Sequence, residues 1–152
     1  MELIELSKFI KNYWNEMGWR SPSAEWDLKL TNLIQDSLIL LKDAIDQSKP
    51  FFILSQMKKE GEEFLKNQKD AKESLKYILF YLKEENITKI NKDNAREIIN
   101  KITVKHFIKK GILMKSLRVA FFGCLSGPDL IQSWELFSEN KIDILLIERC
   151  FN

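Results

Sequence analysis

The sequence predicts an all-α fold, a compact helical bundle or cage of about seven to eight helices. Apolar residues recur at spacings of three and four along most of the chain, which is the period of a helix with one buried face. Only five Gly and three Pro occur in 152 residues, too few for a turn-rich β-sandwich. The 45% of hydrophobic and 30% of charged residues are a globular balance. The length suits one domain, residues 1–152, with expected sub-lobes of about 1–88 and 89–152.

The first half of the chain is expected to contain helices joined by short turns. An amphipathic helix should run to near Gly18, because its apolar residues repeat at helical spacing: Leu3, Leu6, Phe9, Ile10, Tyr13 and Trp14. Ser21-Pro22-Ser23 is a helix-start signal. Residues 25–47 are so rich in Leu and Ile that one long helix is predicted there, the most buried of the fold. Residues 51–54 should form a short helix or turn, since a lone strand has no partner.

The second half is also helical by its start and stop signals. Asp70 and Glu73 have the spacing of a capping box, which predicts a helix from Ala71 to about Glu84, with Asn86 left-handed after it. The stretch 61–76 is the most polar and is expected to face solvent. Four further helices are predicted, at about 91–110 (ended by Gly111), 116–122 (ended by Gly123), 128–137 (with Pro128 in its first turn) and 141–149.

No catalytic constellation is visible. The single histidine, His106, has no nucleophile or acid placed for it by the sequence, and we interpret it as a surface histidine rather than a general base. Two cysteines and one histidine cannot supply the four ligands of a zinc site. Phosphate-loop motifs are absent, so no cofactor and no metal is expected in this chain. Neither a membrane span nor an export signal is recognisable, which predicts a cytoplasmic location.

The distribution of charge is more informative than its sum. A net charge of +2 argues against a strongly cationic nucleic-acid binder. Yet residues 98–128 contain no Asp or Glu and hold six of the 24 cations: Lys101, Lys105, Lys109, Lys110, Lys115 and Arg118. The first three are four residues apart and are expected on one helix face, and the last two are three apart on the next helix. Such a patch can hold a polyanion, although a solvated helix face has the same pattern.

Two local features also have a functional and a structural interpretation. The loop 123–130 contains a turn with Gly at both ends, Gly123 and Gly127, and its backbone N–H groups could meet a phosphate or a base; the alternative is a simple corner between helices. Trp14, Trp19 and Trp26 could stack on bases, but their spacing around a helix joint favours packing anchors.

Residues 109–138 carry a series of short motifs in a fixed order: Lys109-Lys110-Gly111, Lys115-Ser116-Leu117-Arg118-Val119-Ala120, Gly123, Gly127-Pro128-Asp129-Leu130 and Trp134-Glu135-Leu136. A less specific set lies upstream: Leu33-Ile34-Gln35, Leu41-Lys42-Asp43 and Phe51-Phe52. In order and spacing these motifs resemble the C-terminal, anticodon-binding region of bacterial-type glutamyl-tRNA synthetases, closest to the cyanobacterial and plastid-type branch. The resemblance extends from about Leu28 to Phe151.

This resemblance implies an all-α anticodon-binding domain of a class I glutamate–tRNA ligase. The family's ATP motifs are missing here, so ATP and Mg would belong to a catalytic domain outside this chain, which alone should be inactive. The implied partners are glutamate tRNA and that catalytic domain, in the cytoplasm or a plastid stroma. Two rivals remain: the related domain of class I lysyl-tRNA synthetases, and a helical protein-interaction module that lost RNA binding.

The resemblance also implies RNA-contacting residues by position. Anticodon contacts fall on Arg118, Lys115, Gly127, Pro128 and Leu130. Arg118 would bond and stack on a base, Lys115 would hold a phosphate or carbonyl, Gly127 and Pro128 would let the backbone approach a base, and Leu130 would offer an apolar surface. Ser37 stands where some members have an Arg that reads the third anticodon base, so recognition of glutamine tRNA as well is expected. Phosphate contacts are expected at Lys101, Lys105, Lys109 and Lys110.

Overall fold

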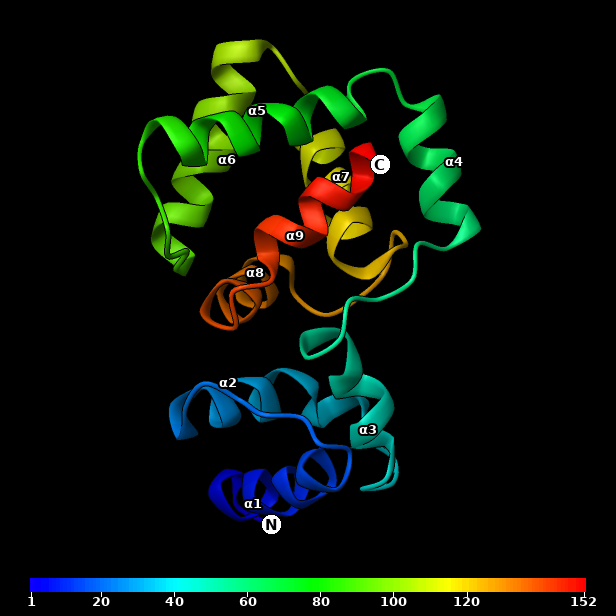
Figure 1. The fold of residues 1–152 in the computed structure, drawn as a ribbon, viewed down its shortest axis with the longest axis vertical. Helices are drawn as coiled ribbons and strands as arrows, with labels where there is room; N and C mark the ends of the chain where they lie inside the picture. Colours follow the sequence, from blue (N-terminus) through cyan, green and yellow to red (C-terminus); the bar gives the residue numbers. More distant parts are fainter. The chain divides into compact units, whose positions relative to one another are not determined.

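The computed structural model describes residues 1–152, and every regular element in it is helical. Nine α-helices and three short 3-10 helices are present and no strand, so the all-α class is confirmed, with slightly more helices than the sequence predicted (Figure 1). The chain divides into two compact units, residues 1–54 and 55–152. The boundary expected near residue 88 falls inside the second unit, between two of its helices.

The first unit contains α1 (Leu3–Glu16), α2 (Ala24–Ile34), η1 (Gln35–Ser37), α3 (Asp43–Ser48) and η2 (Lys49–Phe51). Its core is aromatic: the Phe52 ring lies 5.1, 5.2 and 5.1 Å from the rings of Trp14, Trp19 and Trp26. All three tryptophans are buried, so their interpretation as packing anchors is confirmed. The predicted start of α2 is also confirmed, since Ser23 accepts a hydrogen bond from the Trp26 amide.

The long helix predicted at 25–47 is wrong. α2 ends at Ile34, and Leu38 has an extended backbone. The Asp43 carboxylate accepts hydrogen bonds from the amides of Ile39 and Leu40, which stabilises a turn where a helix was expected. The Ile39 side chain is 91% exposed, so the apolar residues of this turn belong to the surface and not to a central helix.

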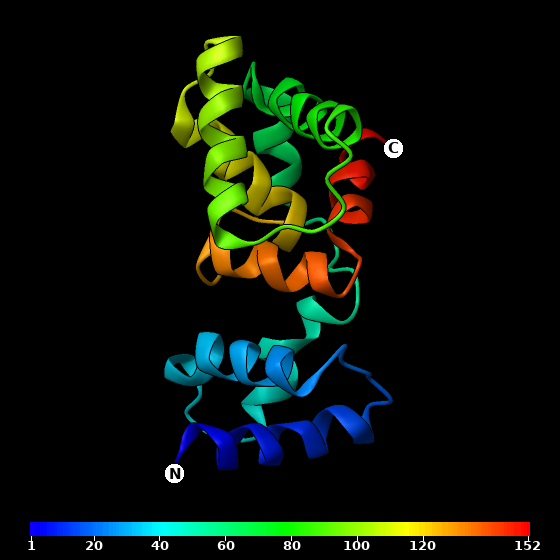
Figure 2. The same cartoon turned by 90° about the vertical axis from the view of Figure 1, so that its left-hand side faces the viewer.

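The second unit contains α4 (Lys59–Asn67), α5 (Ala71–Glu84), α6 (Lys92–His106), α7 (Lys110–Phe122), α8 (Leu130–Glu139), α9 (Asp143–Glu148) and η3 (Arg149–Phe151). Its central helix is α7, which packs against α4, α5, α6, α8 and α9 (Figures 1 and 2). More than half of α7 is buried, so this helix has the central position that the sequence assigned to 25–47.

The boundary between α6 and α7 also differs from the prediction. α6 ends at His106, because Phe107 takes a left-handed conformation with φ 56°. Gly111 does not end a helix; it lies in the first turn of α7, which starts six residues earlier than expected. Lys109 therefore precedes α7 and does not share the α6 face with Lys101 and Lys105, contrary to the four-residue spacing.

Helix ends were predicted with mixed success. Asn86 and Gly123 are left-handed as expected, and Asp129 caps α8 by accepting from the Gln132 amide. The Asp70 capping box is wrong: its backbone is not extended and its side chain makes no cap bond, whereas Asn91 forms a complete box at the start of α6. Pro128 precedes the cap of α8 and lies outside its first turn. Helix α4 was not predicted, because it buries little more than Gly61 and Leu65. None of the helices combines the length and the apolar character needed to cross a bilayer.

Candidate nucleic-acid interface

Arg118 closes the loop between α7 and α8. Its Nη1 atom donates hydrogen bonds to the carbonyl oxygens of Gly127 and Pro128, at 3.2 and 2.9 Å. Sequence reasoning placed these three residues in one site, and the structure brings them together. The side chain is half-buried, and its Nε and Nη2 atoms make no bond within the protein. Arg118 is therefore held in place while part of its donor set stays available to a ligand.

The loop held by Arg118 has a backbone shape that depends on glycine. Gly127 has φ 153°, and a Cβ added there would lie 2.8 Å from the Phe122 ring. A larger residue at this position would therefore press on a buried ring. The two residues that follow complete the corner, since Asp129 turns its carboxylate to the first turn of α8.

The residue before α4 and the first turn of α4 contact the same loop. The Lys58 amide donates to the Gly123 carbonyl at 2.9 Å, and the Glu60 carboxylate accepts from the Leu125 amide at 3.2 Å. Gly61 and Gly123 pack backbone to backbone, because a Cβ on Gly61 would overlap the Gly123 carbonyl oxygen. The loop between α7 and α8 is therefore held to the rest of the second unit by two hydrogen bonds and one close backbone contact.

Sequence reasoning missed Arg149, which joins the segment before α4 to α7. Its guanidinium donates to the backbone carbonyl and hydroxyl of Ser55 and to the Ala120 carbonyl, the last at 2.8 Å. Burial lowers the pKa of Arg149, although an arginine keeps its charge. No local sequence pattern indicates this role, since its partners are 94 and 29 residues away.

The other anticodon-contact residues implied by the resemblance differ in their exposure to solvent. Lys115 is exposed one turn before Arg118 on α7 and has no ion pair. Leu130 is only 2% exposed and belongs to the core, so the structure does not supply the apolar surface expected of it. Ser37 is exposed at the end of η1, in the first unit.

The four lysines expected at phosphates fall into two groups. Lys101 is engaged within the protein, with its Nζ 2.7 Å from the Glu97 carboxylate and 3.3 Å from the Tyr81 hydroxyl. The Glu97 hydrogen bond, followed by that to Tyr81, raises the pKa of Lys101. The other three, Lys105, Lys109 and Lys110, are exposed and make no ion pair, so they are free to meet an anion.

His106 has no catalytic surroundings. Its ring stacks on Tyr77 with centroids 3.6 Å apart and an interplanar angle of 4°. The half-exposed histidine therefore joins the last turn of α6 to α5, and it forms no hydrogen bond or ion pair with a nucleophile or an acid.

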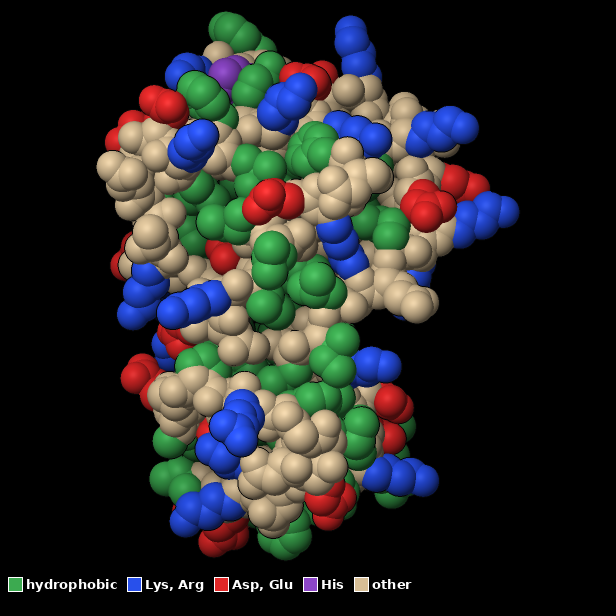
Figure 3. Space-filling model, viewed as in Figure 1, with side chains coloured by type: hydrophobic (Ala, Val, Ile, Leu, Met, Phe, Trp, Pro, Cys, Tyr) green, Lys and Arg blue, Asp and Glu red, His purple; other side chains and the backbone are tan.

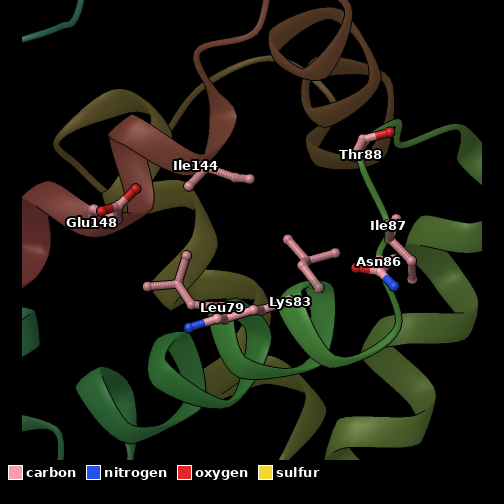
Figure 4. Close-up of a pocket in the computed structure, with 8 residues that line it drawn as sticks. Leu79, Lys83, Asn86, Ile87, Thr88, Ile144 and Glu148 are labelled. Atoms are coloured by element: carbon pink, nitrogen blue, oxygen red, sulfur yellow. The ribbon is translucent and has the colours of Figure 1, made fainter.

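An apolar hollow of about 470 Å³ lies between α5, the turn after it, and α9 (Figure 4). Ile144 points into it from α9, opposite Ile87 in the turn. Its charged members are Lys83 and Glu148, and its other polar members are Asn86 and Thr88.

A helical scaffold that presents free cations and a partly free arginine on one helix has the features of an RNA-binding domain. The comparisons with known proteins specify which one. The family model of the anticodon binding domain matches residues 5–142, so the chain belongs to the anticodon-binding domain family.

Relatives of high identity share one description. The chain is 88% identical over 152 residues to the glutamate–tRNA ligase of Prochlorococcus marinus subsp. pastoris (strain CCMP1986 / NIES-2087 / MED4), with all of this chain and 32% of the relative covered. It is 66% identical over 151 residues to the glutamate–tRNA ligase of strain MIT 9215, with 99% and 31% covered. The chain thus spans about a third of the length of these relatives.

A solved structure has the same fold. The crystal structure of a glutamate tRNA ligase from Elizabethkingia meningosepticum CCUG26117, in complex with its amino acid, aligns with a TM-score of 0.84 at 19% identity. The alignment covers 99% of this chain and 29% of that one. At this identity the match supports the fold and not the individual contacts.

Proposed function

We propose that this chain is the anticodon-binding portion of a glutamate–tRNA ligase and binds the anticodon loop of glutamate tRNA. The observation that carries the proposal is the 88% identity along the whole chain to a protein described as glutamate–tRNA ligase. ATP, Mg and the ligation of glutamate to tRNA would belong to the remaining two thirds of such an enzyme, in the cytoplasm. This chain would supply recognition, and the catalytic portion is its second partner.

Arg118 is the residue proposed to read a base. Its bonds to Gly127 and Pro128 use one nitrogen, which leaves the other edge of the guanidinium free to bond or stack on an unpaired base. Lys115, on the same side of α7, would hold a neighbouring phosphate. The Gly127–Pro128 corner lets the backbone approach the same nucleotide.

Relaxed anticodon recognition is part of the proposal. A serine at position 37 offers one hydroxyl where an arginine would offer a charge and a fork of donors, so discrimination against glutamine tRNA should be weak. Charging of both tRNAs by the full-length enzyme tests this point, and clean rejection of glutamine tRNA would contradict it.

Binding of anticodon stem-loops, followed by fluorescence anisotropy at two salt concentrations, tests the main proposal. Arg118→Ala should weaken binding of the glutamate stem-loop by roughly 1–3 kcal/mol. The matched control is Arg96→Ala, which removes an exposed arginine of α6 outside the acid-free window and should leave the affinity unchanged. A preference for the lysine stem-loop would favour the lysyl-tRNA synthetase alternative, and no binding to any stem-loop would favour the protein-interaction module.

A further inference from the structure

Phe107 is an aromatic residue that contributes nothing visible to the fold. Its side chain is 93% exposed, and it makes no ring contact with another aromatic residue. It ends α6 at φ 56°, a left-handed position that Gly or Asn usually occupies. An exposed bulky ring in an unfavourable backbone conformation is a candidate for a role outside folding.

The surroundings of Phe107 are positively charged. Lys105, Lys109 and Lys110 flank it in sequence, are exposed and form no ion pair. No acid occurs between residues 98 and 128. Tyr77, which stacks on His106, has Glu73 one turn before it on α5. The charge of Glu73 is offset by Lys76, whose Nζ lies 3.8 Å from the Glu73 carboxylate.

The two residues next to Phe107 in the chain are held in place by contacts with the rest of the second unit. The neighbouring His106 stacks on Tyr77 at 3.6 Å, which joins the end of α6 to α5. Ile108, on the other side, is 7% exposed and anchors the chain in the core. In Figure 3 the purple histidine lies among green hydrophobic and blue basic side chains over α5 and α6. Phe107 therefore projects from between two fixed neighbours.

We propose that the Phe107 ring is a stacking platform for an unpaired nucleotide of the bound RNA, with Lys105, Lys109 and Lys110 on its phosphates. Aromatic rings among free cations are how proteins hold single-stranded nucleic acid, because every base has a face that can stack. An exposed ring alone would suit a protein partner equally, but the acid-free cations favour a polyanion. The inference rests on the proposed function and extends it.

This nucleotide is a different one from that at Arg118. Eight residues of α7 separate Lys110 from Arg118, which is a rise of about 12 Å along the helix. The platform at the start of α7 and the arginine near its end would thus hold two points of the same anticodon loop.

Fluorescence anisotropy with the glutamate anticodon stem-loop tests the inference in the 152-residue chain. Phe107→Ala should weaken binding about 5- to 150-fold, and Phe107→Trp should restore most of it. The matched control is Val104→Ala, which trims a 76% exposed apolar side chain of α6 that cannot stack. The slope of log Kd against log salt should stay the same in Phe107→Ala and fall by about 0.7 in Lys105→Gln.

The outcomes separate this inference from the proposed function. Binding that is equally tight in Phe107→Ala, or equally weak in the Ala and Trp variants, overturns the stacking platform and leaves anticodon binding intact. If the unaltered chain does not bind the stem-loop, the proposed function fails and this inference fails with it. Capture of a protein by the unaltered chain but not by Phe107→Ala, without any effect on RNA, also overturns it.

Discussion

Gly123→Ala should destabilise this chain more than Gly18→Ala or Gly111→Ala does. Gly123 has φ 75°, where an L side chain costs about 1–2 kcal/mol. An added Cβ would also overlap the backbone carbonyl oxygen of Gln56 and lie 3.1 Å from the Met57 Cα. Backbone atoms yield less readily than a side-chain tip, and overpacking of this kind costs about 1–3 kcal/mol.

The segment 56–58, which the added Cβ would displace, also forms a hydrogen bond with Gly123. The Lys58 amide donates to the Gly123 carbonyl at 2.9 Å, and its loss adds about 0.5–1.5 kcal/mol. Gly123→Ala should therefore lower the free energy of unfolding by about 3–6 kcal/mol, a large share of the roughly 5–15 kcal/mol of a typical domain. Because Gly123 begins the loop closed by Arg118, RNA affinity should fall as well.

Urea unfolding of three variants separates these contributions. Gly18→Ala has the same left-handed backbone, φ 76°, but nothing within 4 Å of the added Cβ, so it should lose only about 1–2 kcal/mol. Gly111→Ala lies in helix α7 with open space around it and should gain about 0.4–1 kcal/mol. A loss in Gly123→Ala no larger than in Gly18→Ala would refute the close approach of Gln56 to Gly123.

Three further predictions concern single side chains. Arg118→Met should lower the free energy of unfolding by about 1–3 kcal/mol because it removes two hydrogen bonds to the loop, whereas Lys115→Gln should not; equal stability of the two variants in urea would contradict this role of Arg118. Burial raises the pKa of Asp143, so its folded form holds the proton more tightly, and wild-type stability relative to Asp143→Asn should rise as pH falls from 7 to 4. At pH 7 the Asn variant, which can still accept from Trp134, should be more stable than the wild type because it carries no buried charge, and a less stable variant would speak against this. Burial raises the pKa of the Cys150 thiol to about 11, so Cys150 should react with a thiol reagent at pH 8 only on unfolding; rapid labelling of Cys150 in the native chain would contradict this.

Local signals predicted local structure well. The apolar period of residues 3–14 marked α1, the Ser23 hydroxyl marked the start of α2, and Gly123 marked the end of α7. Each of these depends on neighbours within about one turn of helix, so the sequence contains the information. The motif block at 109–138 likewise predicted the family correctly.

Predictions failed where an apolar residue was assigned to the core or the surface from hydrophobicity alone. The apolar run at 38–41 looked like helix interior, but the Asp43 carboxylate holds a turn there and leaves Ile39 exposed. Leu130 was expected at the surface of the RNA site and is buried in the second unit. Neither outcome is visible in hydrophobicity alone, since an apolar residue is compatible with the core or with the surface.

The sequence by itself determined the all-helical class, the family, and the acid-free segment that holds six of the 24 cations. The tertiary structure alone decided which of those cations are free. Lys101 lies against the Tyr81 hydroxyl of α5 as well as pairing with Glu97 on its own helix, while Arg118 divides its donors between the Gly127–Pro128 corner and solvent. It also decided that Phe107 ends α6 and stands exposed between lysines. The physical reason is that burial and contacts between helices depend on groups brought together by packing, whereas helix period, capping and i,i+4 pairs depend on neighbours in the chain.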